Sequence, residues 1–551
     1  MTVAEAPAER PTGWREVDDG ARRQRRRRRR IVVGLAVAEA PRLLRQPLVL
    51  AGLLLSIVLF WRETGGASPV LQRDSVYVAK SLLPLAVATL FALNLLGLRD
   101  RRLGTEELLA AMPHDDRTRW TAWTAVTAVP ALLGAAATAA FTVVLVLRGS
   151  VGAPAWSELS VGLVLVWLSG LAGLALARWL PSVVAPVALV VLAAVATFQL
   201  NGDGTSRSRW LQPFVDFSTK ADAIELARRP TVLHGAALAG IAVALGCLLA
   251  VRRRRPRQVA AAVSLAGAVA AGGLQLRPAS QADIARARRF ALGAPGTQRC
   301  ASRGQVRACL YPGYVGWSGD YLAAASEVLA GAPSTGPAGR FTIYQRPPRL
   351  PVDAYPPRVL VAVDDALYRD AHEDSARVGM VKATGSGERD LYFRSAVGMW
   401  AAGLPPAPQP GKRLFTTEGD AEGMQPPVVM CSAPDSRPVI GLWLAAKDHP
   451  ATAKALADLA RRATASAGTT AVWLIVAGGV YVEPGQAQAA TRLARLPESR
   501  VKAVLRGRWA QVRAGRLSVD ALARAVGLVL PRQSEPRAAP PSITGPTPPC
   551  P

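Results

Sequence analysis

Long apolar runs, of which all but one lack any charged residue, constrain this 551-residue chain more than any other feature. A helix needs roughly 20 mostly apolar residues to cross a hydrocarbon core about 30 Å thick. The first half of the chain holds several runs that approach this length, at residues 48–61, 81–98, 122–147, 161–180, 183–200, 235–251 and 259–276. The pattern therefore predicts an α-helical polytopic membrane protein with about six or seven transmembrane helices and a lipid bilayer around it.

Shifts in charge and composition set the predicted boundaries of this first half. Residues 1–30 end in a block of arginines and should form a disordered cytoplasmic tail, because like charges repel one another. Residues 31–46 mix apolar side chains with Glu39 and Arg42, which is typical of an elbow helix lying in the membrane interface. We expect a six-helix transmembrane domain at 47–252 and a seventh transmembrane helix at 258–276.

The second half has the composition of a mixed α/β soluble domain, predicted at residues 277–530. Helical patterns recur at 320–330, 450–462 and 501–512, and short apolar runs between Pro and Gly predict strands at 341–344, 359–363, 378–381, 391–393 and 428–430. Residues 463–482 carry no charge, and their polarity favours a buried core element, with an eighth span as the alternative. The Pro-rich residues 531–551 should be a disordered tail.

A net charge of +27 would suggest nucleic acid as a partner for a soluble protein. Here the basic residues flank apolar runs, where they hold loops in the cytoplasm and meet anionic headgroups, so no nucleic acid is expected. Four basic clusters fall on one side of the predicted spans, whereas the loop 201–234 breaks the pattern. We expect a multi-pass protein of the plasma membrane, with a cytoplasmic N-terminus and an extracellular C-terminal domain.

Patterns of enzyme chemistry are missing from the sequence. It holds no GxxxxGK[ST] phosphate loop and no GxSxG elbow, and its four histidines are scattered. We therefore expect no enzyme, no catalytic residue, no metal site and no bound cofactor. Cys300 and Cys309 lie close together in a polar segment, where a local disulfide and two free thiols both remain open.

The charged loop at residues 100–120 is the most informative segment for function. Apolar residues recur there at helical spacing, with glutamates on the other side and a proline at the end, at Leu103, Leu108, Leu109, Met112, Glu106, Glu107 and Pro113. This pattern predicts a short amphipathic helix. Such a helix can press into a groove on a soluble subunit or lie on lipid headgroups, and the periodicity leaves both open.

Four segments carry a resemblance to a known family. AEAPRLLRQPLVLAGLLLSIVLFW resembles the elbow and first span of exporter-type ABC-transporter permease subunits of actinobacteria, and RRLGTEELLAAMPHDDRTR resembles their cytoplasmic loop. WLQPFVDFSTKADAIELARRPTVLHGAALAGIAVAL resembles their external loop and last core helix. The segment that begins CLYPGYVGW is similar to the start of an extracytoplasmic domain appended to some of these permeases. The resemblance implies six core spans, a second permease subunit (self or paralogue), and a separate ABC ATPase subunit that binds the ATP. It also implies an ATPase-coupling surface formed by Glu106, Glu107, Leu108, Leu109, Pro113 and Arg117.

We therefore expect the permease subunit of an ABC transporter, an exporter driven by a separate ATPase. The alternative is a membrane-anchored sensor or assembly protein whose extracytoplasmic domain binds a ligand or a cell-envelope component.

Overall fold

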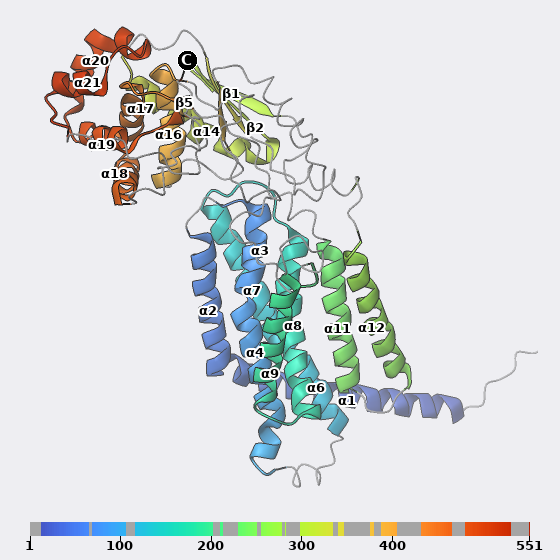
Figure 1. The fold of residues 1–551 in the computed structure, drawn as a ribbon. Helices are drawn as coiled ribbons and strands as arrows, with labels where there is room; N and C mark the ends of the chain where they lie inside the picture. The colour runs from blue at the N-terminus through green and yellow to red at the C-terminus, as the bar shows by residue number, and fades with distance from the viewer. Residues whose placement is uncertain are drawn as a thin grey trace, which may run out of the picture.

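A bundle of long helices carries a mixed α/β domain on one of its ends (Figure 1). This arrangement comes from a computed structural model of the full chain. The structure describes residues 13–65, 69–105, 116–201, 210–212, 230–250, 255–277, 282, 298–333, 340–345, 375–378, 387–404, 431–465, 480–530 and 550.

Six helical segments of the described chain are long and apolar enough to cross a bilayer. They are formed by α2 (Pro47–Thr64), α3 (Leu71–Ser81) with α4 (Leu83–Arg102), α6 (Asp116–Val126) with α7 (Ala128–Leu147), α8 (Trp156–Trp179), α11 (Thr231–Ala250) and α12 (Arg255–Gln275). A shorter apolar helix, α9 (Ala185–Asn201), covers the predicted run at 183–200. Six segments of this length and composition indicate a multi-pass helical membrane protein.

Contacts between α8 and α11 show that these two helices are parallel. Helix α9 belongs to the segment of chain between them, which leads from the end of α8 back to the start of α11. Thr231, at the start of α11, donates a hydrogen bond of 2.9 Å to Glu158 at the start of α8. Arg178, near the end of α8, donates to the carbonyl of Leu249 near the end of α11. The two helices therefore run in the same direction, and the chain between them must return the length of the bundle. The 17 residues of α9 extend about 25 Å along this path.

Helices α4 and α8 pack closely in the middle of the bundle. A Cβ atom added to Gly173 of α8 would lie 2.3 Å from the carbonyl oxygen of Leu90 in α4. Only glycine permits this separation of the two backbones, which is how small residues bring membrane helices together. Leu93 and Leu174 are fully buried beside this contact.

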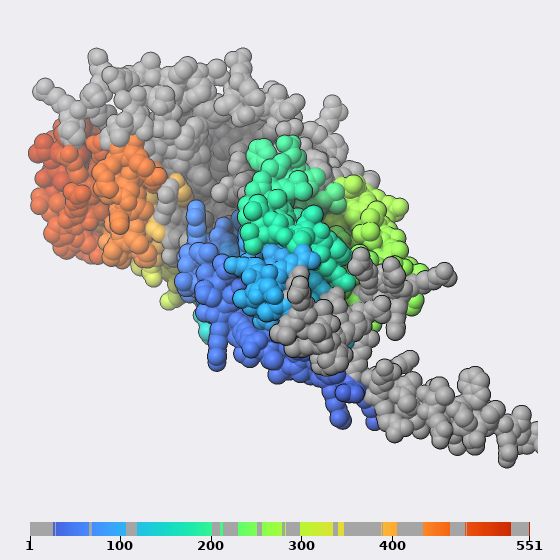
Figure 2. All heavy atoms as spheres, turned by 90° about the horizontal axis from the view of Figure 1, so that it is seen from below, coloured from blue at the N-terminus to red at the C-terminus, as the bar shows by residue number. Residues whose placement is uncertain are grey.

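Helix α1 (Gly13–Leu44) crosses the end of the bundle that lies opposite the α/β domain, and Figure 2 shows this end from below. The predicted disordered tail was wrong for residues 13–30, which are helical and continuous with the predicted elbow at 31–46. Arginine is one of the stronger helix formers, and a helix spaces successive charges around its axis, so a basic block can extend the elbow helix.

The α/β domain is built on a four-stranded sheet of order β1-β2-β3-β4. Strands β1 (Arg299–Arg303) and β2 (Val306–Leu310) are antiparallel, whereas β3 (Phe341–Gln345) and β4 (Ser375–Val378) continue the sheet in parallel. The short strands β5 (Cys431–Ser432) and β6 (Val480–Tyr481) form a second sheet.

Helices supply most of the hydrophobic core of the domain, in which Trp317, Tyr321 and Trp443 are almost fully buried. The helical elements are η2 (Pro312–Trp317), α14 (Ser318–Ala330), α16 (Gly387–Ala401), α17 (Arg437–Ala446), α18 (Pro450–Ala465), α19 (Pro484–Leu493), α20 (Glu498–Arg513) and α21 (Val519–Val526). The helices predicted at 320–330, 450–462 and 501–512 are thus confirmed as α14, α18 and α20.

Comparison with the predicted strands gives a mixed result. Strand β3 confirms the prediction at 341–344, but the predicted strand at 391–393 was wrong, because these residues lie inside α16. A run of three apolar residues is too short to distinguish a helical from a strand period. The predicted strands at 359–363 and 428–430, and residues 466–479 of the uncharged segment, lie outside the described residues.

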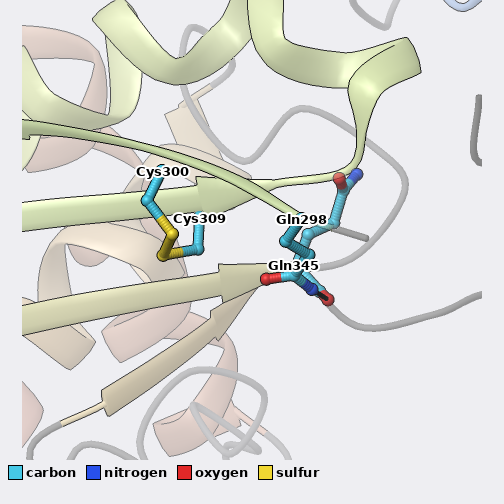
Figure 3. The surroundings of a disulfide bond; sticks show 4 residues. All are labelled: Gln298, Cys300, Cys309 and Gln345. Atoms are coloured by element: carbon cyan, nitrogen blue, oxygen red, sulfur yellow. Dashed lines mark hydrogen bonds between the residues drawn. A yellow bond between two sulfur atoms is a disulfide. The ribbon is translucent and has the colours of Figure 1, made fainter. Parts of the chain in front are cut away.

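Two disulfides involve the described part of the α/β domain. Cys300 in β1 and Cys309 in β2 face each other across the antiparallel pair and are joined by a disulfide (Figure 3). Nearby, the side chain of Gln345, at the end of β3, accepts a hydrogen bond of 2.9 Å from the backbone N–H of Tyr311, just after β2. Cys550 is also disulfide-bonded and is buried in the core, so the predicted disordered tail was wrong at this residue.

The α/β domain meets the bundle through apolar contacts, made against a backbone bridge that lies within the bundle part of the chain. Val70, before α3, forms a β-bridge with Val151, before α8. Both valines belong to the hydrophobic core of the domain, where they join Tyr314 and Trp317 of η2. A Cβ atom added to Gly316 would lie 3.2 Å from the side chain of Val151, so η2 rests closely on the bridge. We call this region the domain joint.

Candidate functional site at the loop end of the bundle

A buried carboxylate ties α1 to α4 at the end of the bundle opposite the α/β domain. Glu39 of α1 accepts two hydrogen bonds from the guanidinium group of Arg99 in α4, at 3.0 and 3.2 Å. Arg42, one turn along α1, donates a third bond to Glu39 at 3.0 Å. The paired geometry of arginine and carboxylate gives directional as well as electrostatic attachment. Helix α1 is therefore held by these bonds against the last turn of α4.

A second ion pair connects the two sides of the charged loop. Asp100, near the end of α4, accepts a hydrogen bond of 3.0 Å from Arg119 in α6. Arg99 also lies 3.8 Å from Asp100, so the two ion pairs share neighbouring residues of α4. The loop between α4 and α6 consequently begins and ends at two elements that are joined by a charged contact.

The end of α4 is a Schellman turn, which sets the direction in which the loop leaves the bundle. Gly104 has a φ of +64° and donates its backbone N–H to the carbonyl of Arg101, while Thr105 donates to the carbonyl of Asp100. These two bonds, with a left-handed glycine, stop a helix. The predicted amphipathic helix was wrong in including Leu103, which lies in this turn after α4.

Aromatic and cationic groups extend the contacts to two more helices. The guanidinium of Arg119 lies over the ring of Trp123 at 5.1 Å, and Trp123 meets Trp120 edge to face at 5.0 Å. Arg178 of α8 lies over Trp120 at 4.9 Å and donates to the carbonyl of Leu249 in α11. Cation–π contacts of this kind are attractive and strengthen away from water. We call these residues, with Glu39, Arg99 and Asp100, the loop-end network.

The residues predicted to form the coupling surface are not those of the loop-end network, although the two sets are close in the sequence. Glu106, Glu107, Leu108, Leu109 and Pro113 lie outside the described residues. Arg117 lies in α6, where its backbone is described and its side chain is not. The assignment of these six residues to a coupling surface therefore stays a prediction.

Glu39, Asp100 and Arg119 belong to the network but are not among the predicted site residues. A signal was present, because ionisable residues next to membrane spans are costly to bury and so commonly pair with one another. Glu39 and Asp100 are both buried in the structure. Their partners stand 60 and 19 positions away in the chain, which no local pattern reveals.

One polar cluster of the α/β domain invites comparison with a catalytic triad. Asp390 of α16 is buried and contacts Arg394, Thr452 and His449. Thr452 and Asp390 both contact the same ring atom of the histidine, Nδ1, at 2.8 and 3.3 Å. A proton relay from hydroxyl to carboxylate uses both ring nitrogens. The cluster therefore joins α16 to α18 without the geometry of a relay.

Metal ligands do not gather within the part of the chain that the structure describes. No group of three or more His, Cys, Asp or Glu side chains is placed there to hold a metal ion. The loop-end network is therefore the candidate site, and its chemistry is mechanical and electrostatic: it joins α1, α4, α6, α8 and α11 at the base of one loop.

The fold and this site define a class: a mostly helical protein with six segments long and apolar enough to cross a membrane, an α/β domain at one end of the bundle and a charged network at the other. Comparison of the chain with protein families, curated proteins and solved structures finds no match.

Proposed function

We propose that this chain is the membrane-spanning permease subunit of an ABC transporter, an exporter driven by a separate ATPase subunit. The observation that carries the proposal is the Asp100–Arg119 ion pair, which joins the two sides of the loop that contains the predicted coupling residues. A loop held in this way transmits a push to both of its helices together. The resemblance of the elbow, the first span and the loop to exporter permeases supports the same assignment.

In this mechanism, the ATPase binds ATP and presses on the surface formed by Glu106, Glu107, Leu108, Leu109, Pro113 and Arg117. The motion passes through Asp100 and Arg119 into α4 and α6. Arg178 carries it onward to α8 and α11 through Trp120 and the carbonyl of Leu249. With a second permease subunit, self or paralogue, the helices then expose a lipophilic or peptide-like substrate to alternate sides of the membrane.

Two independent features support the orientation that this mechanism requires. Arginines gather at the loop end of the bundle, where they favour the cytoplasmic side. The disulfide Cys300–Cys309 lies in the α/β domain at the opposite end, and disulfides persist in oxidising compartments outside the cytoplasm. We therefore place the loop end in the cytoplasm and the α/β domain outside the cell.

Recovery of an ATPase tests the proposal directly. The tagged full chain would be purified from its native membranes in mild detergent, and co-purified proteins would be searched for an ATPase with a phosphate-binding loop. We expect recovery with the wild type and loss of recovery with Leu108→Asp. Leu180→Asp is the matched control, because Leu180 is an exposed leucine just after α8, at the same end of the bundle and outside the loop.

Two outcomes would contradict the proposal. Equal recovery of the ATPase with Leu108→Asp and with the wild type would reject the coupling surface. Wild-type membranes that yield no associated ATPase would favour the alternative, a membrane-anchored sensor or assembly protein. The domain joint favours that alternative specifically, because the close contact of η2 with the Val70–Val151 bridge offers a path from the α/β domain to α3 and α8.

A further inference from the structure

A pocket of about 360 Å³ lies between α1 and α4 at the loop end of the bundle. Its walls differ sharply in chemistry. Arg42, Arg99 and Arg102 supply guanidinium groups and Glu39 supplies one carboxylate, whereas Leu95 and Leu96 are among the residues of an apolar wall. A ligand that fills this pocket must therefore carry an anionic group next to an apolar body.

The charge balance of the pocket favours an anion. Three guanidinium groups face one carboxylate, which leaves an excess of two positive charges. Glu39 already accepts bonds from Arg42 and Arg99, so its oxygens are engaged by cations. The side chain of Arg42 is 68% exposed and Arg102 is also exposed, so both can turn donors toward a ligand. Arginine matches phosphate oxygens with paired donors.

The position of the pocket favours a lipid as the source of this anion. The pocket lies where α1 meets the end of the span that includes α4, and the ends of transmembrane helices lie at the level of the phospholipid headgroups. Free phosphate would satisfy the arginines but would leave Leu95 and Leu96 in contact with water. A phospholipid satisfies both walls, because its phosphate and its acyl chains are covalently joined.

We propose that this pocket binds an anionic phospholipid, whose phosphate is held by Arg42, Arg99 and Arg102 and whose acyl chain lies along Leu95 and Leu96. The lipid extends the contact between α1 and α4, since Arg99 and Arg42 also hold Glu39. This inference requires a bilayer around the bundle and does not rest on the proposed ATPase partner. A basic pocket beside a membrane span is a recognised site for anionic headgroups.

Lipid binding to the full chain in detergent tests the inference. Native mass spectrometry would measure bound phosphatidylglycerol, with phosphatidylcholine and inorganic phosphate as the other two ligands. We expect phosphatidylglycerol to bind at least about tenfold more tightly than phosphatidylcholine, and inorganic phosphate not to compete with it. The double variant Arg42→Gln/Arg102→Gln should lower the affinity for phosphatidylglycerol by roughly tenfold or more, because it removes two of the three guanidinium groups that line the pocket.

Arg45→Gln is the matched control for general attraction between basic residues and anionic lipid. Arg45 is exposed at the end of α1, one turn from Arg42, and does not line the pocket. It should retain wild-type affinity. Leu95→Trp fills the pocket without changing its charge and should also weaken binding, which covers the case in which the double arginine variant fails to fold. Equal affinity for the two lipids, or equal loss in Arg45→Gln and the double variant, would overturn the inference.

Discussion

The two ends of the helix bundle are fastened by different chemistry. At the loop end, charged side chains join separate helices, as Glu39 joins Arg99 and Asp100 joins Arg119. At the domain joint, buried apolar side chains connect the bundle to the α/β domain: Val70 and Val151, bridged to each other, pack with residues of η2. Partly exposed ion pairs contribute little net stability, whereas burial of a large aromatic side chain contributes several kcal/mol.

The contrast indicates how the molecule can move. Charged side chains on long stems can exchange partners at small cost, so the loop end can rearrange while its helices stay intact. The domain joint has no equivalent freedom, because packed apolar groups lose contact energy as soon as they separate. We therefore expect the domain joint to act as a fixed attachment and the loop end as the adjustable one.

The largest expected effect comes from removing an aromatic ring at the domain joint. Trp317 is almost fully buried and packs on Tyr314, with ring centroids 5.4 Å apart. Trp317→Ala should lower the free energy of unfolding of the α/β domain by about 3–5 kcal/mol, because it leaves a cavity in the core. Thermal unfolding and limited proteolysis of the full chain would measure the change.

Trp156→Ala is the control for that prediction. Trp156 begins α8 near the same end of the bundle, but it is 72% exposed. Its removal should change the thermal midpoint of the domain little. Comparable loss of stability in both variants would show that the domain joint does not depend on Trp317.

A smaller effect is expected in the middle of the bundle, between the two ends. Gly173→Ala would place a methyl group 2.3 Å from the carbonyl of Leu90, so α4 and α8 must separate. We expect a loss of about 1–3 kcal/mol, measured as a lower thermal midpoint in detergent. Gly267→Ala in α12 meets no atom within 4 Å and should be neutral or slightly stabilising, because alanine is the better helix former. A lower midpoint in the control and not in Gly173→Ala would contradict this assignment.

The next prediction concerns the loop end. Asp100 is buried and the side chain of Arg119 is 31% exposed, so their contact should be worth about 1 kcal/mol. A double-mutant cycle with Asp100→Asn and Arg119→Gln would measure this coupling, since Arg119 also contacts Trp123 and each single change removes more than one interaction.

Salt dependence separates the loop end from the domain joint in the same cycle. The coupling of Asp100 to Arg119 should decrease in high salt, whereas the loss caused by Trp317→Ala should not. A coupling energy near zero at low salt would show that the pair does not hold the two sides of the loop together.

The sequence predicted the parts of this fold that local patterns determine. Apolar runs predicted the six long apolar segments and the shorter helix α9, and periodicity predicted α14, α18 and α20. Three apolar residues at 391–393 carried too little information, and the neighbouring helix-forming residues placed them in α16. Charge repulsion within the arginine block predicts a disordered tail, but the block is helical, because arginine is a strong helix former and the block continues the elbow helix.

The candidate site required information that no local pattern contains. Glu39 pairs with Arg99 only because α1 crosses the end of α4, and Asp100 meets Arg119 only because the loop returns α6 to the same place. The two open alternatives for Cys300 and Cys309 are resolved by strand register, which places the two residues opposite each other. The predicted coupling residues from Glu106 to Pro113 remain a prediction from the resemblance alone.

The smallest expected effect is a pH dependence of the stability of the α/β domain. It arises from a charged contact of the same kind as those at the loop end, made by Glu498. Hydrogen bonds from Lys447, at 2.8 Å, and from Lys502 lower the pKa of Glu498 below its usual 4.5. A lowered pKa in the folded state means that the pair stabilises the fold above about pH 4.5 and that this stability is lost as the pH falls through the lower, folded pKa. Burial alone would lower the pKa of Lys447, but its bonds to Asp448 and Glu498 raise it overall, so its charge persists throughout this range.

Glu498→Gln should therefore remove part of the acid sensitivity of the domain. The free energy of unfolding of the variant should be lower than that of the wild type by less than about 1 kcal/mol at pH 7, because the side chain of Glu498 is 38% exposed. This difference should vanish at acid pH. Thermal unfolding of the full chain between pH 3 and pH 7 would measure it, with Asp458→Asn on α18 as a control for loss of a surface carboxylate outside this contact. If the difference in stability stayed constant between pH 3 and pH 7, Glu498 would stabilise the domain by packing and not by its charge. The contact would then not be comparable with the ion pairs of the loop end.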